Sequence, residues 1–408
     1  MEYESVKPRF IIDADALEAN LRTLRGVMDR TGCRILLAQK CFSCYALYPL
    51  ISRYISGTTA SGLYEALLAH EMMPDRENHV FSPAYTETDF QQLVTMCNHM
   101  VFNSPRQLQL YAQRARRNGL HTGLRVNPEC STQEGHAIYD PCAPGSRLGT
   151  TLASLDAFVA SLPSGETLTD YIDGIHFHTL CEQNSDDLHT TLQAVETRFG
   201  KYLSQMKWIN FGGGHHITRS DYDITLLEQC IRHMQTTYGL QVYLEPGEAI
   251  ALNAGELQCN VLEVQPAGPD GVANVIVSAS AACHMPDVIE MPYTPPILKP
   301  QAAIHTDVAE SQTDTDANQA DATANEEQHS FVYRLGGPTC LSGDVIGTYR
   351  FSSPLHAGDQ IVFGDMAIYS MVKTNTFNGM PLPDIYIRKA GTLRLWKSFG
   401  YDEFKRRI

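Results

Sequence analysis

Short apolar runs alternate with helix-like stretches over most of the chain, and this alternation restricts the possible folds more than any other feature. Eight such runs end in Gly, Ser, Pro or a polar residue, and most precede a stretch with helical spacing of apolar residues. The runs are RILLAQK (34–40), SGTTASG (56–62), HVFSP (79–83), HMVFNS (99–104), TGLRVNPE (122–129), GIHFHTL (174–180), WINFGGG (208–214) and VYLEPGE (242–248). Strands and helices that alternate eight times predict an α/β fold, a TIM-like (β/α)8 barrel over residues 34–255. SGTTASG has weak strand propensity, and it is counted because its place in the alternation requires a strand.

The pattern changes after residue 255, where strand-like runs follow one another with few helices between them. These runs are LQCNVLEVQ (257–265), NVIVSAS (274–280), FVYRLGG (331–337), DQIVFG (359–364) and DIYIRKA (384–390). They predict a second, all-β domain built from residues 1–33 and 256–408, in which RFIIDAD (9–15) adds a strand. Residues 301–330 hold seven acidic residues and no Lys or Arg, which predicts a disordered acidic insert.

The net charge and the cysteines limit which partners and which cellular compartment we expect for the protein. A formal net charge of -15 argues against nucleic acid and suits a cationic small molecule. No apolar run is long enough to cross a membrane, and the charged first residues do not read as a signal peptide. Among the eleven cysteines only Cys41 and Cys44, in CFSC, show CxxC spacing, and the second such pair that a zinc site of this kind needs is missing. We therefore expect reduced thiols in the cytoplasm, with neither a disulfide framework nor a metal site.

Polar residues gather at the ends of the predicted barrel strands, where the chemistry of such barrels is concentrated. Lys40 ends one run, and a lysine in this place most often reaches solvent. At a barrel mouth it can instead lose its proton by desolvation and form a Schiff base. Gly212, Gly213 and Gly214 end another run just before a helical stretch. They form either a tight turn or a bare backbone whose N–H groups bind phosphate.

Two more strand ends carry an imidazole and a carboxylate. His178 is either a core histidine bonded to a carbonyl or a flat ring that lies over a planar cofactor. Glu245, just before Pro246, forms either a salt bridge in the core or a contact with a protonated pyridine nitrogen. A Schiff-base lysine, a phosphate site, a stacking histidine and an acid for a ring nitrogen together indicate pyridoxal 5'-phosphate.

Long stretches of the chain resemble the pyridoxal-phosphate decarboxylases that combine a barrel with a β domain, the group of ornithine, arginine and diaminopimelate decarboxylases. Within this group the chain is most similar to the carboxynorspermidine decarboxylases. The stretches that carry the likeness are GIHFHTLCEQNSDDL (174–188), NFGGGHHITRSDYD (210–223), EPGEA (245–249), ACHMPDVIEMPY (282–293), GGPTCLSGD (336–344) and TFNG (376–379). The likeness covers nearly the whole chain apart from the acidic insert. It implies decarboxylation of carboxynorspermidine, and of carboxyspermidine, to norspermidine and spermidine in polyamine biosynthesis.

The resemblance also implies roles for the residues that bind the cofactor. Lys40 matches the lysine that carries the cofactor as a Schiff base, and His178 matches the histidine that stacks on its ring. Gly212–Gly214 and Tyr369, in DMAIYS, are similar to the residues that hold the phosphate. Glu245 is similar to the acid that pairs with the pyridinium nitrogen.

The resemblance further implies a homodimer whose active site is shared between subunits. Cys340 matches the cysteine that the partner subunit inserts into the site, where it returns a proton to the substrate. Asp344 accompanies it and is expected to meet the substrate. From the residues alone, Cys340 is equally a small buried residue, Asp344 a turn residue and Tyr369 a core residue of the β domain.

Two departures from the wider group bear on the substrate. Ornithine-type enzymes carry EPGR, whose arginine contacts the phosphate, whereas this chain has Glu248 in that place. Glu248 faces either a substrate amine or solvent at a helix start. Diaminopimelate decarboxylases carry an arginine for the distal carboxylate where this chain has Glu290. Asp287 and Glu290 fit a cationic aminoalkyl tail, or else belong to an exposed acidic loop.

Other functions remain open at this point. The chain is alternatively a diaminopimelate or ornithine-type amino-acid decarboxylase, or a non-catalytic pyridoxal-phosphate carrier or regulator. A racemase related in fold needs a tyrosine as its second base where Cys340 falls, and TCLSGD supplies none. A carrier has no use for Cys340, and regulators of the antizyme-inhibitor kind often lack the Schiff-base lysine. Lys40 and Cys340 together therefore favour an enzyme.

Overall fold

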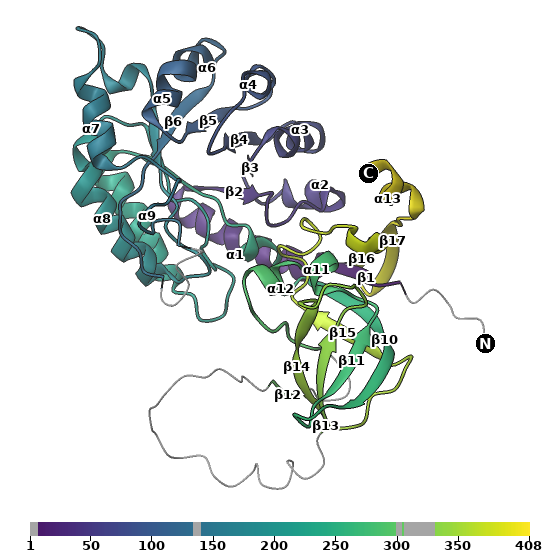
Figure 1. Cartoon of the computed structure of the whole chain (residues 1–408). Coiled ribbons are helices and arrows are strands. Elements are labelled where there is room, and N and C mark those ends of the chain that lie inside the picture. Colours follow the sequence, from purple (N-terminus) through teal and green to yellow (C-terminus); the bar gives the residue numbers. More distant parts are fainter. Residues whose placement is uncertain (1–6, 134–139, 299–303, 306–330) are drawn as a thin grey trace, which may run out of the picture. The chain divides into compact units, whose positions relative to one another are not determined.

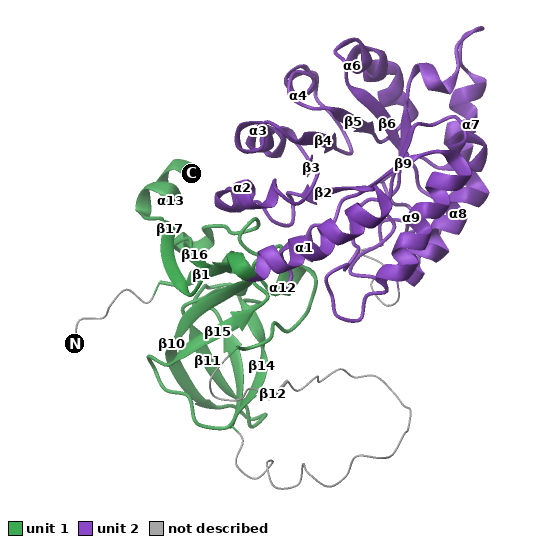
Figure 2. Ribbon diagram, turned by 180° about the vertical axis from the view of Figure 1, so that it is seen from behind, with its two compact units in different colours: residues 1–15, 253–408 green, residues 16–252 purple. Residues whose placement is uncertain are grey.

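The computed structural model describes residues 7–133, 140–298, 304–305 and 331–408. The chain divides into two compact units, which Figure 2 colours separately. The barrel unit is Ala16–Leu252, and the sheet unit is Met1–Asp15 with Asn253–Ile408. Helix α1 (Ala14–Thr31) crosses this boundary, and most of it belongs to the barrel unit, whereas the sequence had suggested residue 33 as the limit.

Helix α1 has a continuous apolar stripe along one face. Leu17, Leu21, Leu24 and Val27 are spaced by three or four residues, and all four are fully buried. This spacing places them on one side of a helix. The segment is therefore an amphipathic helix that packs on a core, and only RFIID before it forms a strand.

Eight parallel strands close into a barrel in chain order, which confirms the predicted fold (Figure 1). They are β2 (Arg34–Ala38), β3 (Gly57–Ala60), β4 (Glu77–Phe81), β5 (His99–Phe102), β6 (His121–Arg125), β7 (Gly174–His176), β8 (Trp208–Asn210) and β9 (Gln241–Leu244). The ring closes where Arg34 and Ile35 of β2 pair with Tyr243 and Leu244 of β9. The weak run SGTTASG contains β3, whose four residues are all buried.

Helices lie around the outside of the ring of strands (Figure 1). They are α2 (Tyr48–Ile51), α3 (Leu63–Met72), α4 (Glu87–Leu93), α5 (Pro105–Gln107), α6 (Gln113–Arg117), α7 (Leu152–Ala160), α8 (Ser185–Leu203), α9 (Ile224–Tyr238) and the short α10 (Glu248–Ala251). Their ends follow ordinary capping chemistry. Asp223 accepts the Leu226 N–H at the start of α9, and Gly239 ends this helix with a φ of +70°.

The sheet unit is built on nine strands in the order β12-β14-β13-β11-β10-β1-β16-β17, with β15 also pairing with β10. Their bounds are β1 (Arg9–Asp13), β10 (Gly255–Ala267), β11 (Ala273–Val277), β12 (Ile304–His305), β13 (Phe331–Gly336), β14 (Val345–Phe351), β15 (Gln360–Gly364), β16 (Asp384–Lys389) and β17 (Thr392–Lys397). β1 pairs antiparallel with β10 and parallel with β16, so the N-terminal run does add a strand here. Three short helices accompany the sheet: α11 (Ala281–His284), α12 (Asp287–Glu290) and α13 (Tyr401–Arg407).

Most of the predicted acidic insert, 301–330, lies outside the described residues. Only residues 304–305 are described there, as the two-residue strand β12 that pairs with β14. No helix in the described part of the chain combines the length and the apolarity that a membrane crossing requires. All eleven cysteines are free thiols.

Candidate active site

The carboxyl ends of the barrel strands bring four of the predicted elements to one mouth. Lys40 follows β2 by two residues, and Glu245 follows β9 directly. His178 follows β7 by two residues, and the triple glycine begins two residues after β8. These positions, which are far apart in the sequence, therefore meet because the ring of strands is closed.

The triple glycine packs so closely against neighbouring backbone that no side chain fits. A Cβ on Gly212 would lie 2.5 Å from the carbonyl oxygen of Phe177, and one on Gly214 would lie 2.2 Å from that of Leu180. Gly212 and Gly214 also have φ values of +71° and +82°, a region that residues with side chains rarely adopt. The packing of the mouth therefore requires glycine at these positions, whether or not they also hold an anion.

The three glycine amides differ in what they bind. Gly212 donates its N–H to Oδ1 of Asn210, and Gly213 donates its N–H to Nδ1 of His178, each at 2.8 Å. The Gly214 N–H donates to no described residue. An anion at this corner therefore finds one ready donor at Gly214 and a bare backbone surface around it.

Lys40 lies near His178 at the mouth, although its own side chain is exposed. Burial lowers the pKa of His178, and the charge of Lys40 is the next largest cause of the same shift. A neutral imidazole that accepts the Gly213 N–H at Nδ1 carries its proton on Nε2. The lysine and the triple glycine are thus both close to one neutral, oriented ring.

Glu245 is a buried carboxylate that the barrel keeps ionised. Its Oε1 accepts from Nδ2 of Asn210 at 2.8 Å, and its Oε2 lies 3.1 Å from Nε2 of His176. Burial alone would raise the pKa of Glu245, but the charge and hydrogen bond of His176 and the amide of Asn210 outweigh it, and the pKa falls to about 2. This acid is therefore a carboxylate across the whole neutral range.

Of the residues around this carboxylate, sequence reasoning placed His176 at a strand end without a role and did not single out Arg125. Arg125 at the end of β6 is 4% exposed, and burial lowers its pKa to about 10, so it stays charged. Its guanidinium lies over the Phe81 ring at 4.7 Å and donates to the His178 carbonyl at 3.4 Å. The ring of His176 also stacks on the Phe81 ring, with the two ring centres 5.6 Å apart. The signal was available, because Arg125 and His176 also occupy predicted strand ends.

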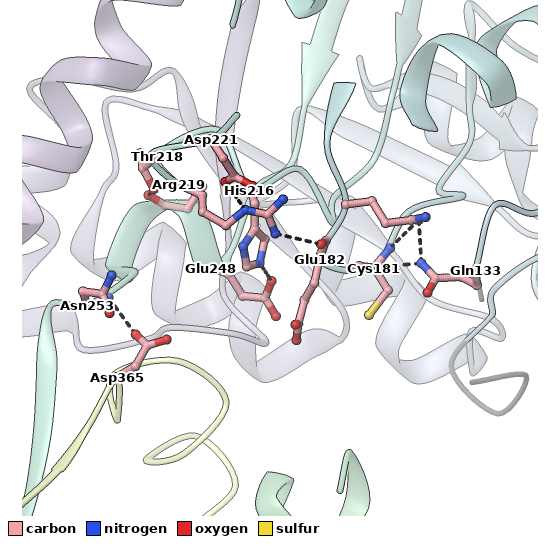
Figure 3. Close-up of polar contacts among 12 residues, drawn as sticks. Gln133, Cys181, Glu182, His216, Thr218, Arg219, Asp221, Glu248, Asn253 and Asp365 are labelled. Atoms are coloured by element: carbon pink, nitrogen blue, oxygen red, sulfur yellow. Dashed lines mark hydrogen bonds and ion pairs between the residues drawn. The ribbon is translucent and has the colours of Figure 1, made fainter. Parts of the chain in front are cut away.

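Glu248 pairs with a histidine of the GGGHH stretch. Its Oε2 lies 2.5 Å from Nε2 of His216, and the two side chains face each other in Figure 3. Both residues are buried. Figure 3 also shows Arg219 between Asp221 and the carbonyl oxygen of Glu182, to which it donates. His216 was not among the predicted site residues, and a contact of Glu248 with substrate stays a prediction.

In the sheet unit, Cys340 and Asp344 belong to the turn between β13 and β14 and differ sharply in exposure. Cys340 is exposed, and its N–H donates to Oδ1 of Asn378 in the TFNG stretch at 2.9 Å. Asp344 is 4% exposed. Its carboxylate accepts from the hydroxyls of Ser280 and Thr339 and from the N–H groups of Ala282 and Thr339. Asp344 thus holds the turn that presents Cys340, and its contact with substrate stays a prediction.

The two acids proposed for an aminoalkyl tail, Asp287 and Glu290, lie on α12 and share one cation. Lys373 forms ion pairs with both, at 2.6 Å to Oε2 of Glu290. The ammonium of Lys373 also lies 5.5 Å from the centre of the Tyr369 ring. Tyr369 has a φ of +47°, which is an outlier for a bulky residue and is typical of functional sites. Asp287 and Glu290 therefore already bind a primary ammonium group, which is the kind of group that an aminoalkyl substrate tail would present.

Comparison with known proteins places these features in one family. Residues 27–367 match the family model described as "Pyridoxal-dependent decarboxylase, C-terminal sheet domain". The chain is 36% identical over the full length of both proteins to a "Carboxynorspermidine/carboxyspermidine decarboxylase" of Campylobacter jejuni.

The chain belongs to the pyridoxal-dependent decarboxylases.

Other members of the family extend this result. A "Carboxyaminopropylagmatine decarboxylase" of Synechocystis is 34% identical to this decarboxylase, over 98% of this chain and 95% of the relative. A crystal structure of the Campylobacter jejuni carboxynorspermidine decarboxylase, complexed with norspermidine, matches with a TM-score of 0.83 and 35% identity, over 98% of this chain and 99% of that one. A diaminopimelate decarboxylase of Helicobacter pylori matches with a TM-score of 0.78 at 16% identity, which shows the same fold.

Pyridoxal phosphate is the cofactor of this decarboxylase, and the barrel mouth fits it. Lys40 supplies a primary amine, Gly214 an N–H that donates to no residue the structure describes, and Glu245 an ionised acid. His178 supplies a neutral ring whose orientation is fixed by Gly213. These are the groups that a phosphorylated pyridine aldehyde requires.

Proposed function

We propose that this decarboxylase removes the α-carboxylate of carboxynorspermidine, and of carboxyspermidine, to give norspermidine and spermidine in polyamine biosynthesis. The observation that carries the proposal is the 36% identity, over the full length of both chains, to a relative named for these substrates. The likeness to a relative that was solved with norspermidine supports it, because norspermidine is the product expected from the first substrate.

The barrel mouth supplies the groups that bind and orient the reacting centre. Pyridoxal phosphate, when bound, takes up the electron pair that the departing carboxylate leaves behind. Lys40 would hold the cofactor through its amine, and the substrate amine would take over that place. Glu245, ionised at neutral pH, would keep a proton on the pyridine nitrogen, and His178 would stack on the ring. Gly212–Gly214, through their bare backbone and the Gly214 N–H, and Tyr369 would hold the phosphate.

Cys340 is proposed as the general acid. Its thiol donates a proton to the α-carbon after carbon dioxide has left, and the thiolate regains a proton from water. Its exposure on a turn between β13 and β14 fits a residue that enters the site of a partner subunit in a homodimer. Asp344 maintains the shape of this turn and, in this proposal, also faces the substrate.

The acids of the sheet unit and of α10 are proposed to select a cationic substrate. Asp287 and Glu290 hold the ammonium of Lys373, and an aminoalkyl tail presents the same chemical group. Glu248, paired with His216, is the third candidate acid. The net charge of -15 favours the approach of a polycation. The free thiols fit a reducing compartment, for which we propose the cytoplasm.

A second substrate is favoured by one specific observation. The Synechocystis relative, named for carboxyaminopropylagmatine, is nearly as similar as the Campylobacter jejuni relative. Carboxyaminopropylagmatine ends in a guanidinium group rather than an amine, so the two substrates differ at the tail that the acids contact. The decision between them therefore depends on the tail-binding residues and not on Lys40 or Glu245.

The test is a side-by-side decarboxylation assay of the cofactor-loaded protein. Carboxynorspermidine, carboxyspermidine, carboxyaminopropylagmatine, diaminopimelate and ornithine are compared by carbon dioxide release. We expect the highest kcat/KM with carboxynorspermidine or carboxyspermidine. A preference for diaminopimelate or ornithine, or bound cofactor without gas release from any substrate, would contradict the proposal.

A further inference from the structure

The amino end of the barrel, opposite to the catalytic mouth, carries a ladder of three histidines. His79 of β4 is in register with His99 of β5, and His99 is in register with His121 of β6. The rings of His79 and His99 stack with their centres 3.9 Å apart, and those of His99 and His121 are 4.8 Å apart. Catalysis in such barrels uses the carboxyl ends of the strands, so the reaction does not account for this ladder.

Three side chains of this region have the donor atoms of a transition-metal site. One ring nitrogen each from His79 and His99 and one carboxylate oxygen of Glu77 all lie within 4.8 Å of one another. Nε2 of His79 is 2.8 Å from Oε2 of Glu77. His99 is only 5% exposed, and its buried Nδ1 has no hydrogen-bond partner in the described structure. A buried nitrogen without a partner lowers stability unless it gains one.

We propose that Glu77, His79 and His99 bind a divalent transition-metal ion of the Zn²⁺ or Co²⁺ class at the amino end of the barrel. Tetrahedral Zn²⁺ with ligand bonds of about 2.1 Å separates its ligand atoms by about 3.4 Å. Rotation of the side chains reaches this geometry if spacings of up to 4.8 Å close by at most about 1.4 Å and the 2.8 Å pair of His79 and Glu77 opens by about 0.6 Å. The ion takes the place of the proton between Nε2 of His79 and Glu77, and that proton moves to Nδ1 so that the ring binds as a neutral imidazole.

The cation Arg34 lies behind the proposed carboxylate ligand, Glu77. Arg34 pairs with Oε1 of Glu77 and leaves Oε2 to the ion, as residues behind metal ligands commonly do. The positive charge of Arg34 also weakens the site, so we expect modest affinity.

Solvent reaches the side chains at this end of the barrel. The side chain of Glu77 is 20% exposed, and that of His121 is 54% exposed. An ion enters along this side, and water or His121 fills the fourth position. The ligands come from two neighbouring strands, so the bound ion ties β4 to β5 and stabilises the barrel without touching the reaction.

The experiment uses the intact cofactor-loaded protein, stripped of metal with a chelator and titrated with Co²⁺. We expect one bound ion per chain after dialysis, a higher melting temperature, and a visible Co²⁺ spectrum of nitrogen and oxygen ligands. The variants His99→Gln and Glu77→Gln should each lose the ion and the rise in melting temperature. His233→Gln is the matched control, because His233 forms an exposed pair with Glu196 at 2.8 Å on the barrel unit.

Three outcomes would overturn the site. They are no ion retained by the wild-type protein, a thiolate-to-cobalt band showing that the free cysteines bind it, and unchanged binding in His99→Gln. The first two are read from the wild-type protein alone, so a variant that fails to fold does not leave the proposal undecided. None of these three measurements uses the substrate, so they can disprove the metal site without bearing on the proposed decarboxylation.

Discussion

The barrel mouth and the sheet unit hold their candidate residues in different ways. At the mouth, Glu245 and His178 are fixed by hydrogen bonds from neighbouring strands, and each has a defined protonation state. In the sheet unit, Cys340 is an exposed thiol on a turn, and Glu290 pairs with a flexible lysine. A closed ring supports each strand end from both sides, whereas a turn is supported only at its base. The mouth is therefore preorganised by its own strands, whereas we expect the position of Cys340 to be fixed only by contacts with a second subunit.

The largest expected effect tests the mouth as a cofactor site. Lys40→Ala should abolish carbon dioxide release and the visible absorbance of the bound cofactor, because it removes the amine proposed to form the covalent link. Absorption spectra and gas release measure the two losses. Lys40→Arg keeps the charge that acts on His178 but cannot form the link, and it should be equally inactive. Retained absorbance and activity in Lys40→Ala would remove the basis of the mechanism.

The next effect tests the dependence of Cys340 on a second subunit. Cys340→Ala should lower kcat by about 10²- to 10⁴-fold while cofactor binding is unchanged, as expected for loss of a general acid. Cys130→Ala, at a partly buried thiol in the barrel unit, is the control and should keep full activity. Mixing inactive Lys40→Ala with inactive Cys340→Ala should restore activity through hybrid dimers. If mixed subunits exchange without recovery, the shared site is wrong.

A third prediction concerns how much the stability of the barrel unit depends on glycine at position 214. Gly214→Ala should lower the free energy of unfolding by about 2–5 kcal/mol, because it combines a left-handed φ with overpacking against Leu180. Gly239→Ala shares the positive φ but has open space around it, so it should lose only about 1–2 kcal/mol. Urea unfolding measures both. Equal losses would mean that the close approach to Leu180 is unimportant.

The fourth prediction concerns pH and the pair of His216 with Glu248. Burial disfavours the charged imidazole, but the hydrogen bond and charge of Glu248 outweigh it and raise the pKa of His216. A raised pKa stabilises the fold fully below the ordinary histidine pKa of about 6.5, and this contribution disappears as pH rises through the raised value. His216→Gln should therefore cost about 1–3 kcal/mol at pH 6 and progressively less at alkaline pH. A difference that is constant with pH, measured by urea unfolding, would contradict the charged pair.

The smallest effect is expected at the acids of the sheet unit. Glu290→Gln should change the free energy of unfolding by less than about 1 kcal/mol, because its side chain is 57% exposed. If Glu290 contacts the substrate tail, KM for carboxynorspermidine should rise about 2- to 5-fold with kcat unchanged. Asp270→Asn breaks the comparable pair with Arg334 and should leave KM unaltered. Equal KM values for both variants would assign Glu290 to Lys373 alone.

The sequence predicted the elements of the barrel better than those of the sheet unit. All eight barrel strands were found, because an apolar run followed by an amphipathic stretch repeats in the local sequence. In the sheet unit, VIGTYRF of β14 and TLRLWK of β17 were missed. β17 is mostly exposed and carries two basic residues among its six, so it lacks the continuous apolar run on which strand prediction depends.

The candidate residues at the mouth were predictable, but their partners were not. Lys40, His178 and Glu245 stand at strand ends that the periodicity locates. His216 with Glu248, and Asp344 with Ser280, are separated by 32 and 64 residues, and no local pattern links them. Spacing could not reveal the Glu77, His79 and His99 cluster either, because its third residue comes from the next strand.

The sequence by itself determined the order of strands and helices, and hence which residues lie at strand ends, because periodicity and capping act over a few neighbouring residues. Only the tertiary structure decided which groups are charged, buried or paired. Those properties depend on strand closure and register, which bring Asn210 and His176 to Glu245 and the Leu180 carbonyl to Gly214. Protonation state and close approach are set by distance in space, which a linear sequence does not record.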